Sequence, residues 1–424
     1  MISLLSIITT VRKVYIMSFK NKLTSSILLV AVIICSTAFS SSPLFEKEIA
    51  VGKFYSIENK LICISHRGDT ENYPENSLDG VKSALKTGAD FVSVNLEKTA
   101  DGVFYLCESE SLGNVCNAPY ESLSQMNSAE AEKYKLYDVF GKETEHKLTS
   151  LETLLKKTDS EDGIILDVKA EDKDAVYGVL AENDALYRVI LRVEESGARL
   201  AEWAQSKDEK VYVIGVYGGN IIFSTISAVN SLTKAEMPAV QLESKNYFNV
   251  AYGEFFTNRY LTKDKVRAVA ATYSPDLCGQ RGDSSDGWNE LIKKGYSVIE
   301  TNNIEAFNKY REETERLEKA IAELCGKTAD FDVGKFSQVS LDNLEKAEKE
   351  CERLLAASAF SLDEAQQAYS RLIFALEDMK ISTGEVDTRG ALNVTAGKLI
   401  AAVLVGAALL AGQIFVYKMR RKSK

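Results

Sequence analysis

The chain has 424 residues, of which 45% are hydrophobic and 26% are charged. This length supports two or three folded units, and the composition excludes a wholly disordered chain, because disordered segments are poor in the apolar residues that form a core. Four basic residues precede residue 43 and five follow residue 417, with no acidic residue at either end, so the middle holds 42 basic against 61 acidic residues, a net charge of −19. A middle this acidic argues against nucleic acid and anionic lipid surfaces as partners.

The amino-terminal end has the pattern of a secretory signal peptide. Basic residues between Arg12 and Lys22 precede an apolar run over residues 23–40, which ends in small residues. A basic region, a short apolar run and a small-residue exit are typical of a signal peptide, which we predict over residues 1–42, followed by a linker over 43–60. An uncleaved amino-terminal anchor is the alternative, although the apolar run is short for a membrane span.

Short apolar runs rich in β-branched residues alternate with helical patterns over residues 61–303. Strands that recur with intervening helices predict a parallel α/β arrangement, and about 240 residues suit a (β/α)8 barrel. A doubly wound open sheet is the alternative, but no glycine-rich nucleotide loop follows the first run. The runs are Leu61–Ile64, Phe91–Leu96, Val103–Cys107, Ile164–Val168, Val189–Val193, Val211–Val216, Ala239–Leu242, Val266–Thr272 and Ser297–Thr301.

A different composition follows the predicted barrel. Three charged segments, 304–324, 341–357 and 362–379, carry apolar residues at helical spacing. This spacing predicts three amphipathic helices, which we interpret as a small three-helix bundle over 304–381. A sustained coiled coil is the alternative, but the segments are short and their heptads are not maintained. Residues 382–398 then have the composition of a polar stalk. The resemblance of such modules to those of Gram-positive surface proteins suggests a spacer or a site for a surface partner.

The carboxyl-terminal end predicts a membrane anchor. Residues 399–417 form an uncharged run rich in Ala, Val, Leu, Ile and Gly, long enough for one transmembrane helix of about 20 residues. Basic residues fill the tail at 418–424, so the positive-inside rule places this tail in the cytoplasm and the rest outside, as a single-pass cell-membrane protein. A buried core helix and a cleaved sorting signal are the alternatives, although no clear sorting motif precedes the run.

Cysteine usage fits an exported protein without fixing any pairing. Six cysteines follow the predicted signal peptide, an even number that suits an oxidising compartment. The local pairs are Cys107 with Cys116 and Cys325 with Cys351. Buried, reduced cysteines are the equal alternative, because free cysteine is among the most buried residue types.

Ordered motifs in the barrel resemble the glycerophosphodiester phosphodiesterase family. The resemblance spans residues 61–302 and is most specific in the amino-terminal block. It implies a TIM barrel of the phospholipase-C-like phosphodiesterase type. The motifs are His66-Arg67-Gly68, Pro74-Glu75-Asn76, Gly88-Ala89-Asp90, Thr99-Ala100-Asp101-Gly102, Asp167-Val168-Lys169 and the closing strand over 295–302.

The resemblance implies the hydrolysis of a glycerophosphodiester, a small phosphodiester or lipid headgroup, with Ca²⁺ or Mg²⁺. In the family, three carboxylates hold the cation, two histidines act as acid and base, and Arg and Lys neutralise the phosphate. His66 matches the first catalytic histidine, and Arg67 and Lys169 match the substrate-binding cations. Glu75 matches the glutamate of the family's Pro-Glu-Asn motif and is a candidate metal ligand, and Asp167 stands where a metal-binding glutamate is usual.

The remaining positions of the family site are altered. Ser93 and Asn95 replace the Glu-x-Asp metal pair, and Glu108 with Ser109 replaces the His-Asp that contains the second catalytic histidine. Two other carboxylates offer substitutes. Glu97 lies on the same strand face as Ser93 and Asn95 and is a candidate metal ligand, and Glu108 is a candidate general acid. With so few carboxylates, Ca²⁺ or Mg²⁺ would bind weakly or not at all. His146, the other histidine, lies away from any strand end and is interpreted as a surface residue.

Two functions follow from this mixture of kept and altered positions. In the first, the barrel recognises a phosphodiester headgroup or a partner through His66, Arg67 and Lys169, and its hydrolysis is impaired. In the second, the protein is an active phosphodiesterase whose site is rearranged around Glu75, Glu97, Glu108 and Asp167. An Arg281-Gly282-Asp283 tripeptide matches an integrin-binding motif, but a tripeptide without structural context is weak evidence, and we predict a loop near the site instead.

Overall fold

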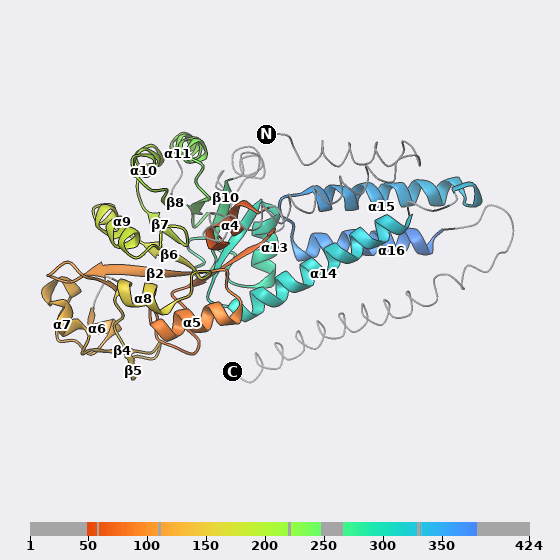
Figure 1. The fold of residues 1–424 in the computed structure, drawn as a ribbon. Coiled ribbons are helices and arrows are strands. Elements are labelled where there is room, and N and C mark those ends of the chain that lie inside the picture. Colours follow the sequence, from red (N-terminus) through yellow and green to blue (C-terminus); the bar gives the residue numbers. More distant parts are fainter. Residues whose placement is uncertain are drawn as a thin grey trace, which may run out of the picture. The chain divides into compact units, whose positions relative to one another are not determined.

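The structure is a computed structural model that describes residues 49–56, 59–108, 112–218, 222–246, 266–328, 331 and 333–379. These residues divide into two units (Figure 1). The first comprises the described residues up to 318 together with 356–366, and the second comprises 319–355 together with those from 367 onward. The predicted signal peptide, stalk, transmembrane helix and basic tail lie outside the described residues.

Eight parallel strands close into a barrel in the first unit. They are paired in the order β1-β2-β6-β7-β8-β9-β10-β11, and β11 pairs with β1, so the sheet has no free edge. The predicted (β/α)8 barrel is confirmed, and the open sheet is excluded. The strands are β1 (Ile62–His66), β2 (Phe91–Lys98), β6 (Gly163–Asp167), β7 (Val189–Val193), β8 (Tyr212–Gly218), β9 (Ala239–Glu243), β10 (Arg267–Ala271) and β11 (Tyr296–Thr301).

Outward-facing residues of the strands pack against helices, which form the outer layer of the barrel (Figure 1). Serine side chains cap several of these helices. Ser77, Ser150, Ser196 and Ser284 each accept a hydrogen bond from a first-turn N–H group, which satisfies a donor that the helix cannot pair internally. The helices are α5 (Leu78–Thr87), α8 (Leu151–Lys157), α9 (Lys173–Glu182), α10 (Gly197–Gln205), α11 (Ile222–Lys234) and α13 (Ser285–Lys293).

The amino-terminal end of the barrel interior is apolar. Because side chains alternate across a strand, every second residue points inward, and these residues form one buried cluster with helix α4 (Ile49–Tyr55). A segment predicted as linker therefore helps to close the barrel. The cluster consists of Ala50, Val51, Phe54, Ile62, Ile64, Phe91, Ile165, Ile190, Tyr212, Ile214, Ala239, Val269 and Val298.

Truncation of Phe54 tests the contribution of helix α4. Phe54 is 2% exposed and its ring lies 4.9 Å from that of Phe91, so Phe54→Ala leaves a cavity. We expect a loss of about 3 to 5 kcal/mol in the free energy of unfolding, measured by urea denaturation. Phe140→Ala is the matched control, because Phe140 is 91% exposed. Equal effects of the two substitutions would show that α4 does not close the barrel.

A small excursion separates β2 from β6. It contains β3 (Phe104–Leu106), which pairs antiparallel with β2, and a hairpin of β4 (Lys135–Tyr137) and β5 (Glu143–Lys147). It has its own apolar cluster, which includes Cys107 and Cys116. Its short helices are α6 (Leu112–Val115), η1 (Leu123–Gln125) and α7 (Ser128–Ala131).

Three helices follow the barrel close to the predicted positions: α14 (Ile304–Thr328), α15 (Gln338–Ala356) and α16 (Leu362–Glu377), with a short η4 (Val333–Lys335) between the first two. In the second unit, Arg371 of α16 forms an ion pair with Glu350 of α15. None of the helices in the described part of the chain is long and apolar enough to span a membrane. All six cysteines within the described residues have free thiols.

Candidate functional site

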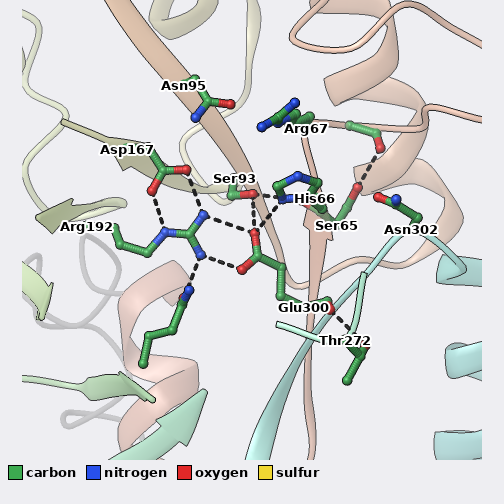
Figure 2. A network of polar contacts seen from close by, with 12 residues as sticks. Ser65, His66, Arg67, Ser93, Asn95, Asp167, Arg192, Thr272, Glu300 and Asn302 are labelled. Atoms are coloured by element: carbon green, nitrogen blue, oxygen red, sulfur yellow. Dashed lines mark hydrogen bonds and ion pairs between the residues drawn. The ribbon is translucent and has the colours of Figure 1, made fainter. Parts of the chain in front are cut away.

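Polar side chains form one layer inside the barrel, on the side toward the carboxyl ends of the strands (Figure 2). Active sites of (β/α)8 barrels lie at that end. Each side chain has the same inward parity as the apolar cluster, one or two pleats further along its strand. The polar layer consists of His66, Ser93, Asp167, Arg192, Gln241 and Glu300, from β1, β2, β6, β7, β9 and β11.

Arg192 connects the polar layer across the barrel. Its Nε and Nη2 donate to the two carboxylate oxygens of Asp167, its Nη2 and Nη1 donate to those of Glu300, and Nη1 also donates to Oε1 of Gln241 at 2.8 Å. All five N–H groups of the guanidinium are therefore paired. Figure 2 shows the Asp167 and Glu300 carboxylates on two sides of the guanidinium. The two carboxylates and the complete donor pairing hold the pKa of Arg192 above its ordinary value, although burial alone would lower it.

Glu300 is fully buried yet remains ionised. Burial raises its pKa, but the charge of Arg192 and the hydrogen bond with His66 outweigh burial and hold the pKa well below its ordinary value. Its Oε1 also accepts a hydrogen bond of 2.6 Å from Oγ of Ser93. Glu300 thus joins the histidine of β1, the serine of β2 and the arginine of β7.

His66 is held in one orientation by two contacts. Its Nδ1 lies 3.0 Å from Oε1 of Glu300, and its ring stacks on that of Tyr273 with centroids 3.4 Å apart. A carboxylate at one ring nitrogen fixes the tautomer and the orientation of an imidazole, which leaves Nε2 as the ring nitrogen that Glu300 does not engage. Burial raises the pKa of Tyr273, which keeps its hydroxyl protonated.

Arg67 lies at the rim in a strained backbone conformation. Its φ is 60°, and the φ of Asn76 is 56°, both in the left-handed region that residues other than glycine rarely adopt. The backbone N–H of Arg67 donates to the carbonyl of Ser93, and that of Asn76 donates to the carbonyl of Arg67, so strand β2 and the Pro74–Asn76 turn hold this conformation. Two sequence motifs therefore converge on one rigid corner beside His66.

The Arg67 side chain forms ion pairs with Glu75 and Glu108. Both carboxylates are well exposed, with side-chain accessibilities of 45% and 37%. Nε of Arg67 is buried and has no hydrogen-bond partner among the described residues. The guanidinium therefore keeps one unused donor, and its two carboxylate partners are accessible to solvent.

Lys169 and Glu97 form a separate pair at the rim, 2.6 Å apart. Asn95 of β2 contacts Asn76. The backbone N–H of Asn95 donates to Oδ1 of Asn76 at 3.0 Å. Nδ1 of His146, on β5, lies 2.9 Å from Oδ2 of Asp79, outside the polar layer. Predicted residues thus gather at one end of the barrel, and His146 does not join them.

The predicted metal ligands do not converge on one point. Each of the three is bound to a different cation: Glu75 to Arg67, Glu97 to Lys169 and Asp167 to Arg192. Among the described residues, no group of three His, Cys, Asp or Glu side chains has the geometry to hold a metal ion. Hard divalent cations need several oxygen ligands at one point, so these residues do not fit Ca²⁺ or Mg²⁺.

Among the polar layer, the rim ion pairs and the adjacent Glu243, carboxylates outnumber cations. Each of the three cations already has a carboxylate partner, so an anionic ligand must replace a carboxylate in order to reach one of them. Exchange is least costly at the rim, because exposed ion pairs contribute about 0 to 1 kcal/mol. The cations are Arg67, Lys169 and Arg192, and the carboxylates are Glu75, Glu97, Glu108, Asp167, Glu243 and Glu300.

Sequence reasoning missed Arg192 and Glu300, the two central residues of the polar layer. A signal was present in each strand. Arg192 is the one charge in the run Val189–Val193, and its parity is that of the inward Ile190; Glu300 has the parity of the inward Val298. A charge on the inward face of a buried strand requires a partner inside the barrel.

The Arg281-Gly282-Asp283 tripeptide is part of the fold. Asp283 accepts hydrogen bonds from the hydroxyls of Thr272 and Thr301, from Nε1 of Trp288 and from the backbone N–H of Asn302. The carboxylate therefore ties the ends of β10 and β11 to helix α13. An aspartate with four internal donors is not presented to a receptor.

Comparisons with known proteins agree with this arrangement. Residues 66–215 match the model of the Glycerophosphoryl diester phosphodiesterase family. The chain is 32% identical over 78 residues to glycerophosphodiester phosphodiesterase 1 of Bos taurus, and 34% identical over 58 residues to a glycerophosphodiester phosphodiesterase of Caldanaerobacter subterraneus. These matches cover 17% and 14% of this chain, and each spans only 24% of the relative's length.

One solved structure extends the likeness to the whole barrel. A glycerophosphoryl diester phosphodiesterase from Parabacteroides distasonis has a TM-score of 0.52 at 17% sequence identity. The superposition covers 62% of this chain and 90% of that one. At this identity the likeness concerns the fold.

Proposed function

Since the chain is a member of the glycerophosphodiester phosphodiesterase family, we propose that its barrel binds a phosphodiester headgroup at the ends of the strands and hydrolyses it poorly. The observation that carries this proposal is the Arg67 corner. Its backbone is strained, its guanidinium has an unused Nε donor, and its carboxylate partners are exposed. Strain maintained by the surrounding fold is typical of binding sites.

Binding proceeds by exchange at the rim. A phosphate oxygen replaces Glu108 or Glu75 on Arg67, because a guanidinium binds phosphate through the same paired geometry that it uses for a carboxylate. His66 directly precedes Arg67 at the end of β1, and its Nε2 is the ring nitrogen not engaged by Glu300. Lys169 follows β6 and pairs with Glu97 of β2. The acidic surroundings favour a headgroup whose other end is cationic over a free phosphate.

Impaired hydrolysis follows from the altered positions. Ser93 and Asn95 supply no charge for a metal ion, and Glu108, at the position of the second histidine, is bound to Arg67. A proton-transfer partner typically contributes about 10² to 10⁴-fold to a rate, and a metal ion contributes further charge stabilisation. The barrel therefore binds its ligand and hydrolyses it slowly.

The carboxyl-terminal end of the chain and the helices after the barrel indicate where the protein acts. The apolar run at 399–417 anchors the protein in a cell membrane, with the barrel outside and the basic tail at 418–424 in the cytoplasm. Helices α14 to α16 form a bundle module that spaces the barrel from the membrane or contacts a surface partner. The basis for these assignments is the sequence pattern.

Binding of glycerophosphocholine, measured by isothermal titration calorimetry, tests the proposal. Arg67→Ala is expected to weaken binding by about tenfold or more, because hydrogen bonds to a charged group are worth about 1.5 to 3 kcal/mol. Arg199→Ala, at an exposed position of α10, is the matched control and is expected to leave binding unchanged. Equal binding by wild type and Arg67→Ala would refute the proposed site.

The alternative function is an active phosphodiesterase with a rearranged site. The contact that favours it is the His66–Glu300 pair, since a carboxylate that orients an imidazole is the arrangement of a general base. Turnover of glycerophosphocholine with Ca²⁺, Mg²⁺ or a chelator, compared between wild type and His66→Ala, separates the two functions. Turnover that His66→Ala abolishes would favour the alternative over binding alone.

A further inference from the structure

We propose that the guanidinium of Arg192 is the resident cation of this barrel and supplies the positive charge that a divalent metal ion, implied by the family resemblance, would supply. The charges of the polar layer are then balanced by protein side chains, without a bound metal ion. Asp167, one of the predicted metal ligands, gives both of its carboxylate oxygens to Arg192. The strands β6 and β7 place these two residues at the same register position, so the contact follows directly from the sheet.

The donor geometry makes Arg192 a complete substitute for an ion at this position. Its five N–H groups reach oxygens on three different strands: those of Asp167 on β6, Gln241 on β9 and Glu300 on β11. A metal ion at the centre of a barrel would collect oxygen ligands from several strands in the same way. Because the guanidinium is 4% exposed and fully paired, an entering ion would have to displace it.

Three residues of the polar layer belong together in this interpretation. Ser93 carries no charge, Glu300 supplies a buried carboxylate from another strand, and Arg192 supplies the positive charge between Glu300 and Asp167. Oγ of Ser93 donates to Glu300 at 2.6 Å, so a carboxylate at position 93 would lie against Glu300 and repel it. The layer therefore keeps a cation between two carboxylates, although β2 has Ser93 and Asn95 at the positions of the two metal ligands.

The inference stands apart from phosphodiester binding, since it concerns buried residues and needs no ligand at the rim. It predicts that removal of Arg192 opens a cation site. In Arg192→Ala, the carboxylates of Asp167 and Glu300 and the amide oxygen of Gln241 surround an emptied volume. These are hard oxygen ligands of the kind that Ca²⁺ and Mn²⁺ accept.

Thermal unfolding and Mn²⁺ titration of the full chain test this inference. Wild type is expected to have the same melting temperature in chelator, Ca²⁺ and Mn²⁺, and to bind no Mn²⁺ at this site. Arg192→Ala is expected to melt roughly 10 °C lower in chelator, because the buried carboxylate of Glu300 and the half-buried carboxylate of Asp167 lose their partner. Mn²⁺ is expected to bind this variant with a dissociation constant of about 10⁻⁴ M and to raise its melting temperature.

Arg188→Ala is the matched control. Arg188 is equally buried, but it donates to a threonine hydroxyl and to two backbone carbonyls, and within the described part of the chain no carboxylate accepts a hydrogen bond from it. Its removal is expected to lower the melting temperature without rescue by Mn²⁺. The double variant Arg192→Ala, Asp167→Asn is likewise expected to lose the rescue. Failure of Mn²⁺ to rescue Arg192→Ala would overturn the inference, as would an Asp167-dependent Mn²⁺ site in wild type.

A charge-balanced variant decides the question if Arg192→Ala fails to fold. Arg192→Met with Glu300→Gln removes the cation together with one of its two carboxylates. This double variant is expected to melt within a few degrees of wild type, well above Arg192→Met alone, because replacing a buried ion pair costs far less than breaking it. A double variant as unstable as Arg192→Met would overturn the role of Arg192 as counter-cation.

Discussion

Glu300→Gln is expected to lower the free energy of unfolding at pH 7 by about 3 to 5 kcal/mol, the cost of breaking a buried ion pair from one side. The glutamine amide accepts fewer hydrogen bonds and carries no charge, so Arg192 keeps only Asp167 as an anionic partner. His66 at the same time loses the carboxylate that orients its ring. The effect is therefore expected both in urea denaturation and in the position of His66.

The cost of Glu300→Gln is expected to depend on pH. Charged and titratable groups reach Glu300 from several strands: Arg192 from β7, His66 from β1, Glu243 from β9 and Tyr273 after β10. Their net effect lowers the pKa of Glu300, so this group stabilises the folded state above its unfolded pKa and loses that contribution as the pH falls below it. The difference between wild type and Glu300→Gln should shrink by roughly 1.4 kcal/mol per pH unit below about pH 4.5.

Urea denaturation at pH 7.0, 5.0 and 3.5 measures this difference. Glu152→Gln is the matched control, because Glu152 lies on the surface in an i,i+4 pair with Lys156 and should cost less than 0.5 kcal/mol. A difference between wild type and Glu300→Gln that stays constant from pH 7.0 to 3.5 would contradict an ionised Glu300.

The barrel could be predicted because each of its strands contains a short run dominated by apolar residues, as expected for strands that are buried on both faces. Helix α4 could not be predicted in the same way. It has only seven residues, so it lacks the length over which helical periodicity is recognised, and its stability comes from burial of Phe54 rather than from its own sequence. The residues against which it packs lie on several strands and come together only when the barrel closes.

The candidate site was predicted at the rim and missed at the centre. The family motifs identified His66, Arg67 and Lys169, because each of these residues stands at a fixed position within a motif. Arg192 belongs to no motif, and Glu300 lies in the closing-strand motif at a position to which no role was assigned. The two residues meet across the barrel from strands that are not neighbours. Parity along each strand indicates that both charges point inward, but their contact depends on the curvature of the closed sheet, which no single strand encodes.

Asp283→Ala is expected to lower the free energy of unfolding by about 3 kcal/mol or more, since the carboxylate satisfies four donors and each buried donor left unpaired costs about 1 to 3 kcal/mol. Arg281→Ala removes an ion pair with Glu290, on side chains that are 31% and 43% accessible, and should cost less than 1 kcal/mol. The two residues of one tripeptide are thus expected to behave differently in urea denaturation.

This contrast also decides the adhesion interpretation of the tripeptide. A receptor that bound Arg281-Gly282-Asp283 would depend on both charged side chains, so both substitutions would reduce cell attachment while the fold stayed intact. A structural role predicts the opposite pattern, because Asp283 ties β10 and β11 to α13 and Arg281 does not. Attachment that is lost equally in the two variants, with no loss of stability in Asp283→Ala, would contradict the structural role and restore the motif as a binding site.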